Sequence, residues 1–131
     1  METNDMSTGI GVQISGTFDI AIIRQHIRKL AQELRWPPEL FLRGIAAVTA
    51  LAETIYFRDR VRQGPLVVYI HVIDQDGFNG MELHTDADFV SVSRDFPLAR
   101  WHLQRVCNEL KIIREENHDH IVLSVWSNGR R

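Results

Sequence analysis

LVVYIHVI, residues 66–73, is the stretch of the sequence that decides the fold. Its residues are β-branched or apolar almost without interruption, which predicts a central strand that is covered on at least one face. Residues 74–80 (DQDGFNG) have the composition of a turn, and residues 81–85 are expected to return as a second strand. The middle of the chain therefore predicts a β-hairpin within a larger sheet.

Two helices and a strand are expected before this hairpin. Residues 18–36 carry apolar side chains every three or four positions, and the Pro37-Pro38 pair stops that helix and can begin the next one. The second helix is expected from Glu39 to about Arg58, with small residues such as Gly44 that allow a neighbour to approach closely. Residues 9–15 alternate in the manner of a half-buried strand.

A third helix and a closing hairpin are expected after it. Pro97 opens the helix, whose apolar positions continue to Leu110, and the hairpin strands are residues 112–116 and 120–126. The order is β, α, α, β, β, α, β, β. Hairpins pair antiparallel, and single helical connections favour a mixed sheet. The predicted fold class is thus α/β, a two-layer sandwich with a mixed, mostly antiparallel sheet and helices on one face.

The composition places the chain among ordinary globular proteins. Of its 131 residues 44% are apolar and 24% are charged, which excludes a disordered chain. One domain over residues 9–127 is expected, with a disordered or frayed start at 1–8 and a tail at 128–131. The net charge of −2 gives no global basic field for nucleic acid, and no apolar run approaches the roughly 18 residues of a membrane span. A single cysteine, Cys107, fits a reducing cytoplasm.

The glycines are unevenly distributed. There are eight, and none lies between Gly80 and Gly129. Glycine-rich phosphate loops need backbone that approaches the phosphate closely. The C-terminal half is therefore not expected to contain one.

Several segments together resemble a known family. They are Asp19–Gln25, Leu30–Leu34, Ala47–Tyr56 and Leu103–Leu110. On these segments the chain resembles the serine kinases that act as anti-sigma factors, and most closely the switch kinase of the stressosome. The likeness covers about residues 9–126 and implies the histidine-kinase-like ATPase fold that gyrase B shares.

The resemblance also implies a nucleotide pocket, which this sequence fills with unsuitable residues. The family has a glutamate base on its second helix and, four residues on, an asparagine that binds Mg²⁺ with ATP. The matching positions are Ala50 and Thr54. Alanine accepts no proton, and a threonine hydroxyl is a weaker magnesium ligand than an amide. Glu53 lies near the same helix face, which leaves a displaced base open, although a solvated glutamate explains it as well.

The other two parts of the implied pocket are altered too. Asp86 stands where the family binds adenine, but the glycines that should follow it are missing. The lid is reduced to residues 91–96, and residues 99–102 (ARWH) replace a glycine-rich turn. An empty pocket of this size loses dispersion contacts or must hold water, so Phe89 or Phe96 is expected to fill the space. The pocket is therefore expected to be degenerate, with no bound cofactor.

The resemblance then implies a non-catalytic regulatory module that binds protein partners in a sigma-factor switching pathway. The implied partner classes are a STAS-domain antagonist, a sigma factor or a PP2C-type phosphatase. Arg24, Arg28 and Arg35 share one face of the first helix, and we expect them to contact an acidic partner surface. A merely solvated helix face is the competing interpretation.

Two alternatives to this function stay open. The chain could be an active ATP-dependent serine/threonine protein kinase that uses Glu53 and requires Mg²⁺ with ATP. It could also be a structural subunit that forms a homodimer through a helix face or an edge strand. Both differ from the first hypothesis in properties that can be measured, namely nucleotide binding and size in solution.

The histidines and the cysteine invite a search for reactive sites. His118 and His120 stand two residues apart in a predicted turn, while His71 and His84 occupy neighbouring predicted strands close to Asp86. We expect these histidines to be packed or hydrogen-bonded, with no metal site, and a metal site stays open as the alternative. The mid-helix Cys107 is expected to be a buried structural thiol.

Overall fold

The computed structural model describes residues 9–56, 66–75, 78–87, 94 and 96–127. Several sequence expectations concern residues outside this part of the chain. They are the frayed start at 1–8, the helix end at Arg58, Phe89, most of the shortened lid and the tail at 128–131.

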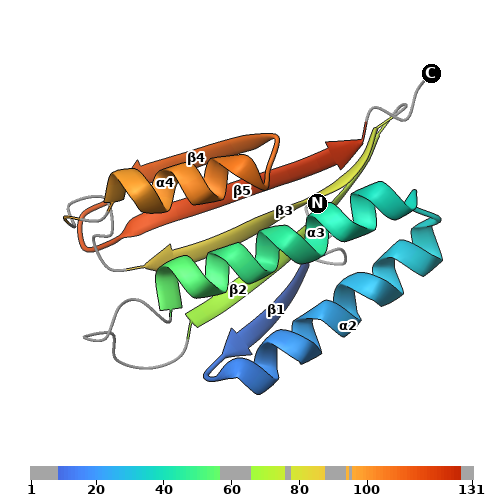
Figure 1. Ribbon diagram of the computed structural model, residues 1–131, viewed down its shortest axis with the longest axis horizontal. Helices are drawn as coiled ribbons and strands as arrows, with labels where there is room; N and C mark the ends of the chain where they lie inside the picture. The colour runs from blue at the N-terminus through green and yellow to red at the C-terminus, as the bar shows by residue number, and fades with distance from the viewer. Residues whose placement is uncertain (1–8, 57–65, 76–77, 88–93, 95, 128–131) are drawn as a thin grey trace, which may run out of the picture.

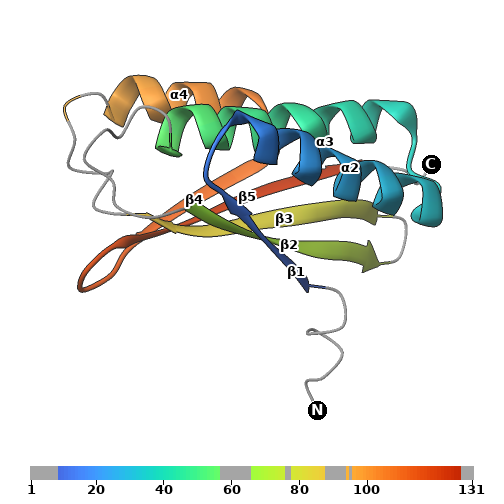
Figure 2. The same ribbon diagram turned by 90° about the horizontal axis from the view of Figure 1, so that it is seen from below.

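The described elements form two layers. Figure 2 shows the helices lying together over one face of the sheet while the other face has no helix against it. The sheet strands are β1 (Gly9–Ile14), β2 (Leu66–Gln75), β3 (Phe78–Ala87), β4 (Glu109–Arg114) and β5 (Asp119–Ser127). The helices are α2 (Thr17–Leu34), α3 (Pro38–Leu51), which continues as the π-helical turn η1 (Ala52–Tyr56), and α4 (Phe96–Arg105). The predicted two-layer α/β sandwich is confirmed.

The strand order is β1-β2-β3-β5-β4, and every pairing between described strands is antiparallel. The prediction of a mixed sheet was therefore wrong. Helix α4 does connect strands that run in the same direction, β3 and β4, but β5 lies between them and pairs with both (Figure 1). The chain reverses direction three times between β1 and β2, at each end of the α2–α3 pair and between the two helices, so β2 lies antiparallel beside β1.

The core lies between the helices and the inner face of the sheet. Gly44 of α3 is buried, and a Cβ atom there would lie 2.9 Å from Met81 Cε and 3.4 Å from Ile27 Cγ2. The small residue therefore lets α3 approach both the sheet and α2, as the sequence predicted. The largest fully buried side chains come from α2, α3, α4, β1, β2, β3 and β5: Ile14, Ile23, Ile27, Leu40, Leu51, Ile70, Met81, Leu83, Leu103 and Ile121.

Two helix ends differ from the sequence prediction. Helix α2 stops at Leu34 because Arg35 takes a left-handed conformation (φ 55°), and the Trp36 amide then donates to the Ala31 carbonyl at 2.9 Å. Helix α4 stops at Arg105, and Leu110 belongs to β4, where it pairs with Leu123. The apolar spacing of α4 continues into β4, so periodicity alone extended the helix too far.

The second helix is α-helical only to Leu51, and the next five residues widen into η1, while its expected end at Arg58 lies outside the described residues. Within the described residues, no helix combines the length and the apolar character that crossing a membrane requires.

Candidate functional site

The expected nucleotide positions on α3 and η1 offer little room for a ligand. Ala50 is half-buried and packs against the core, and Thr54 is only 9% exposed. Glu53 is exposed on the π-helical turn. The glutamate therefore lies at the surface while Thr54 is enclosed by the fold.

Asp86 lies on the other side of the sheet from these residues. Its neighbours Thr85 and Ala87 are buried beneath the helices at 1% and 3% exposure, and strand alternation directs Asp86 to the open face. The Asp86 side chain is 59% exposed. Because the sheet separates them, Asp86 does not share a pocket with Ala50 and Thr54.

Phe96 lines a hollow of about 330 Å³ between α4 and β4. The hollow is also lined by Arg100, Leu110, Ile112 and Arg114. Leu110 and Ile112 belong to the edge strand β4 and also pack against the core, so the hollow borders that strand.

The nominated arginines lie on the helix layer. Arg24 and Arg28 are exposed, and both reach toward α3: Arg24 Nη2 donates to Thr49 Oγ1 at 3.2 Å, and the Arg28 guanidinium lies 5.6 Å from the centre of the Phe41 ring. Arg35, also exposed, follows the end of α2 in its left-handed conformation. The first two arginines therefore lie along the seam between α2 and α3, and the third lies beyond the helix end.

Apolar surface accompanies the two seam arginines. Phe41 is half-buried under the Arg28 guanidinium, and Leu42, which follows it on α3, is 63% exposed. We define Arg24, Arg28, Phe41, Leu42 and Thr49 as the α2–α3 surface.

The open face of the sheet carries a second group of polar residues. Strand alternation directs His84 and Asp86 of β3 to this face, together with His120 of β5, whose Cα pairs with that of Asp86. His118 precedes His120 by two residues and takes the same face. Glu115 begins the β4–β5 turn, which the Glu115 amide closes by donating to the His118 carbonyl at 2.8 Å.

These side chains form a continuous network. The His118 Nε2 atom lies 2.8 Å from Glu115 Oε1 and 3.4 Å from Asp86 Oδ1. The same Asp86 oxygen lies 2.7 Å from His120 Nδ1. On the other side, His84 Nδ1 lies 3.2 Å from His120 Nε2. We call Glu82, His84, Asp86, Glu115, His118 and His120 the histidine–carboxylate network.

The number of ring hydrogens limits how His84 and His120, at the centre of the histidine–carboxylate network, can bond to each other. Glu82 Oε1 lies 2.9 Å from His84 Nε2, so the ionised carboxylates of Glu82 and Asp86 each accept the N–H of one ring. The ring nitrogens that face each other, His84 Nδ1 and His120 Nε2, then have no hydrogen between them if both rings are neutral. A hydrogen bond across this gap therefore requires an additional proton, shared by the two rings.

In the sequence, His118 with His120 and His71 with His84 stand out as two separate pairs. The structure places all four in one group of neighbouring side chains. The ring of His71 also meets that of His84 edge to face, with centres 4.8 Å apart. Glu82 and Glu115 were missed. Period-two alternation along β3 was the signal that could have found Glu82, whereas Glu115 lies in the turn after β4. Glu82 stands two residues before His84, and Glu115 lies across the turn from His118.

Cys107 has the environment of a structural thiol. It is half-buried, and its Sγ donates to the Leu103 carbonyl at 3.1 Å. Burial raises its pKa from the ordinary 9.0 to about 11, against a smaller lowering effect of Arg43. A thiol so rarely ionised is a poor nucleophile, which agrees with the interpretation as a structural thiol. The expected mid-helix position was wrong, because α4 ends at Arg105, two residues before Cys107.

No protein-family model and no curated protein matches the chain. The family resemblance therefore stays a hypothesis that rests on the residues quoted for it.

Proposed function

We propose that this chain is a non-catalytic regulatory module that acts by binding a protein partner. In this proposal it is a degenerate relative of the anti-sigma and switch kinases, with the histidine-kinase-like ATPase architecture. The observation that carries the proposal is the separation of Thr54 and Asp86 by the sheet. Residues that should meet around one nucleotide lie on two sides of it, and Ala50 supplies no base.

The α2–α3 surface is the proposed contact for the partner. Two exposed guanidinium groups, one of which lies over the half-buried Phe41 ring, supply arginine, a residue type enriched among the energetically dominant residues of protein interfaces. Their positive charge favours an acidic partner surface and speeds its association. The partner classes implied by the resemblance are a STAS-domain antagonist, a sigma factor and a PP2C-type phosphatase.

Charge reversal tests this contact. The double variant Arg24→Glu/Arg28→Glu should weaken binding to the true partner by roughly 100-fold, because two attractive charges become repulsive. Arg35→Glu should have a smaller effect, since Arg35 lies beyond the helix end. Arg100→Glu on α4 is the matched control and should leave affinity unchanged. Unchanged affinity of the double variant, measured by calorimetry against each partner class, would exclude the α2–α3 surface.

Nucleotide binding separates this proposal from the kinase alternative. We expect millimolar ATP with Mg²⁺ to leave the unfolding temperature of the chain unchanged. A true ligand at one hundred times its Kd would stabilise the fold by about 2.7 kcal/mol. Such a stabilisation, together with phosphoryl transfer that Glu53→Gln abolishes, would replace the binding module with an active serine/threonine kinase.

A further inference from the structure

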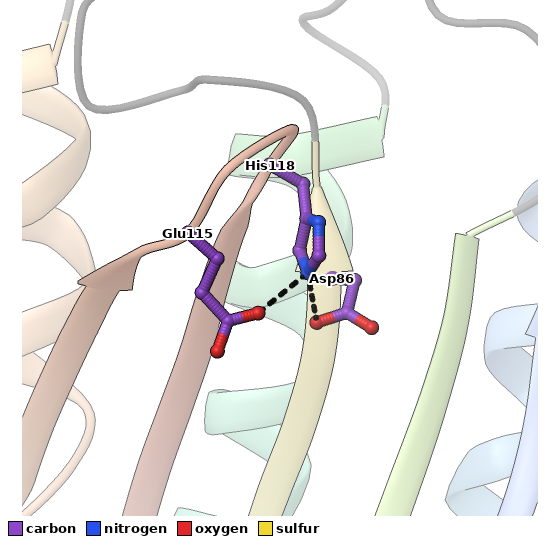
Figure 3. A group of neighbouring side chains, drawn as sticks. All are labelled: Asp86, Glu115 and His118. Atoms are coloured by element: carbon purple, nitrogen blue, oxygen red, sulfur yellow. Dashed lines mark ion pairs between the residues drawn. The ribbon is translucent and has the colours of Figure 1, made fainter.

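We propose that Asp86, Glu115 and His118 form a site for a divalent transition-metal ion, best suited to Zn²⁺, on the open face of the sheet. Figure 3 shows the His118 ring lying between the two carboxylates, with an ion pair to each. The proposed site lies on the face opposite the helices and does not depend on the partner-binding function.

The distances between the donor atoms suit a small metal ion. One nitrogen and one oxygen from each carboxylate all lie within 4.8 Å of one another. Zinc bonds of about 2.0–2.2 Å in a tetrahedron place donor atoms roughly 3.3 Å apart. The His118 Nε2 atom already lies 2.8 Å from Glu115 Oε1 and 3.4 Å from Asp86 Oδ1, so these two donor pairs need only small side-chain shifts.

The donor types favour transition metals such as zinc over calcium and magnesium. Carboxylate oxygens alone would suit Ca²⁺ or Mg²⁺, but an imidazole nitrogen shifts the preference toward transition metals. At a site of mixed nitrogen and oxygen ligands, zinc binds more tightly than manganese or iron. Three protein donors also leave room for water as a fourth ligand.

Charge balance gives the metal a defined role at this position. The Nε2 atom of His118 carries at most one hydrogen, yet two carboxylates face it. A cation in the place of that hydrogen would bind all three donors and neutralise the repulsion between Asp86 and Glu115. Protons compete for the same nitrogen and oxygens, so metal affinity should fall as the pH is lowered.

The backbone holds the donors in register. His118 and Glu115 are linked across the closed turn between β4 and β5, and Asp86 lies on β3 directly beside His120. Two donors therefore come from one closed turn and the third from the strand paired with β5, which limits the reorganisation that binding requires.

A second set of residues orients one of the proposed ligands. The His120 Nδ1–H group donates to Asp86 Oδ1 at 2.7 Å, and His120 is in turn contacted by His84. Groups that hold a metal ligand in place in this way typically contribute 10- to 100-fold to metal affinity. His120 is therefore a positioning residue, one step removed from the metal.

Isothermal titration of the full, tag-free chain with ZnCl₂ at pH 7.5 tests the site. We expect one Zn²⁺ per chain at micromolar or tighter Kd, of the order that one imidazole and two carboxylates provide. His118→Ala should lose roughly 100-fold or more, and His120→Ala roughly 10- to 100-fold. His102→Ala, at an exposed histidine on α4, is the matched control and should bind as the wild type does.

Two outcomes of the zinc titration would contradict the proposed metal site. Absence of zinc binding at 100 times the expected Kd would overturn the proposal, and so would zinc binding that survives unchanged in His118→Ala. Far-UV circular dichroism confirms that each variant is folded. If His118→Ala fails to fold, Glu115→Gln in the exposed turn gives the same test, with a loss of affinity expected and unchanged affinity excluding the site.

Discussion

At the scale of single residues, Gly80 shows where the fold leaves no space for a side chain. A Cβ atom there would lie 2.8 Å from both Cα and Cβ of Trp126 and closer still to the Val125 carbonyl oxygen. The oxygen and the Cα belong to the β5 backbone, which also fixes the position of the Cβ, so none of the three atoms can rotate away. Gly80→Ala should therefore destabilise the chain by about 1–3 kcal/mol in urea unfolding.

Gly16 is the control for this substitution. It precedes α2 with extended backbone (φ −175°), and a Cβ atom there would meet nothing within 4 Å. Gly16→Ala should change the unfolding free energy by less than about 0.5 kcal/mol, because reduced freedom of the unfolded chain offsets a weaker helix cap. Equal effects of the two substitutions would contradict the steric explanation.

Cys107 makes a prediction about pH. Because burial raises the pKa of its thiol to about 11, the reactive thiolate is a small minority at neutral pH. The rate of alkylation by iodoacetamide should increase about tenfold per pH unit from 8 through 10, whereas a thiol of ordinary pKa levels off near 9. Mass spectrometry of the native chain measures the rate. A plateau at pH 9 would show that the thiol ionises normally.

At the scale of elements, Arg43 connects α3 to the far end of the sheet. Its Nη2 donates to Asn108 Oδ1 at 2.6 Å and its Nη1 to the Trp126 carbonyl at 3.1 Å. Asn108 Oδ1 also accepts the Trp126 amide at 2.8 Å, so one guanidinium joins the helix, β5 and the entry to β4.

Replacing Arg43 should loosen that junction. Arg43→Met should cost about 1.5–3 kcal/mol, since both hydrogen bonds involve a charged donor. Arg43→Lys should recover less than half of this, because an ammonium group lacks the planar fork that reaches both acceptors. Lys29→Met, at an exposed position on α2, should change stability by less than about 0.5 kcal/mol. Wild-type stability of Arg43→Lys in urea unfolding would contradict the role of the fork.

The elements also show which features were open to prediction from sequence. The strand and helix order followed from periodicity, because each element buries one face and its apolar spacing records which one. The end of α4 did not, since Leu103, Val106 and Leu110 fit one helical stripe although Leu110 lies in β4. Boundaries of this kind depend on tertiary pairing, here the Asn108 amide donating to the Ser124 carbonyl at 2.8 Å.

At the scale of the whole molecule, topology decided what the sequence left open. The helical connection α4 correctly implies that β3 and β4 run in the same direction, but nothing local reveals that β5 lies between them. The same insertion brings His120 beside Asp86 and so assembles the histidine–carboxylate network. The arrangement of the sheet and the pairing of His120 with Asp86 were therefore missed for one reason, the unknown position of β5.

The strand order also predicts how stability is distributed. Strands β2, β3 and β5 are paired on both sides, while β1 and β4 form the edges. Most of β5 is buried, whereas β4 has no buried residue. Backbone amides at a sheet edge exchange through local opening, and amides in the centre exchange only when the whole domain unfolds.

Hydrogen exchange with mass spectrometry should therefore rank the strands. Peptides covering residues 81–86 and 120–125 should exchange most slowly, at a rate that rises with urea as steeply as global unfolding does. The peptide covering residues 109–114 should exchange faster and with little dependence on urea, because β4 can separate from β5 while the α2–α3 layer stays packed on the inner strands. Equal protection and equal urea dependence in β4 and β5 would mean that β4 unfolds only with the rest of the core. In that case the hollow between α4 and β4 would be as rigid as the centre of the sheet, and the edge position of β4 would have no consequence for stability.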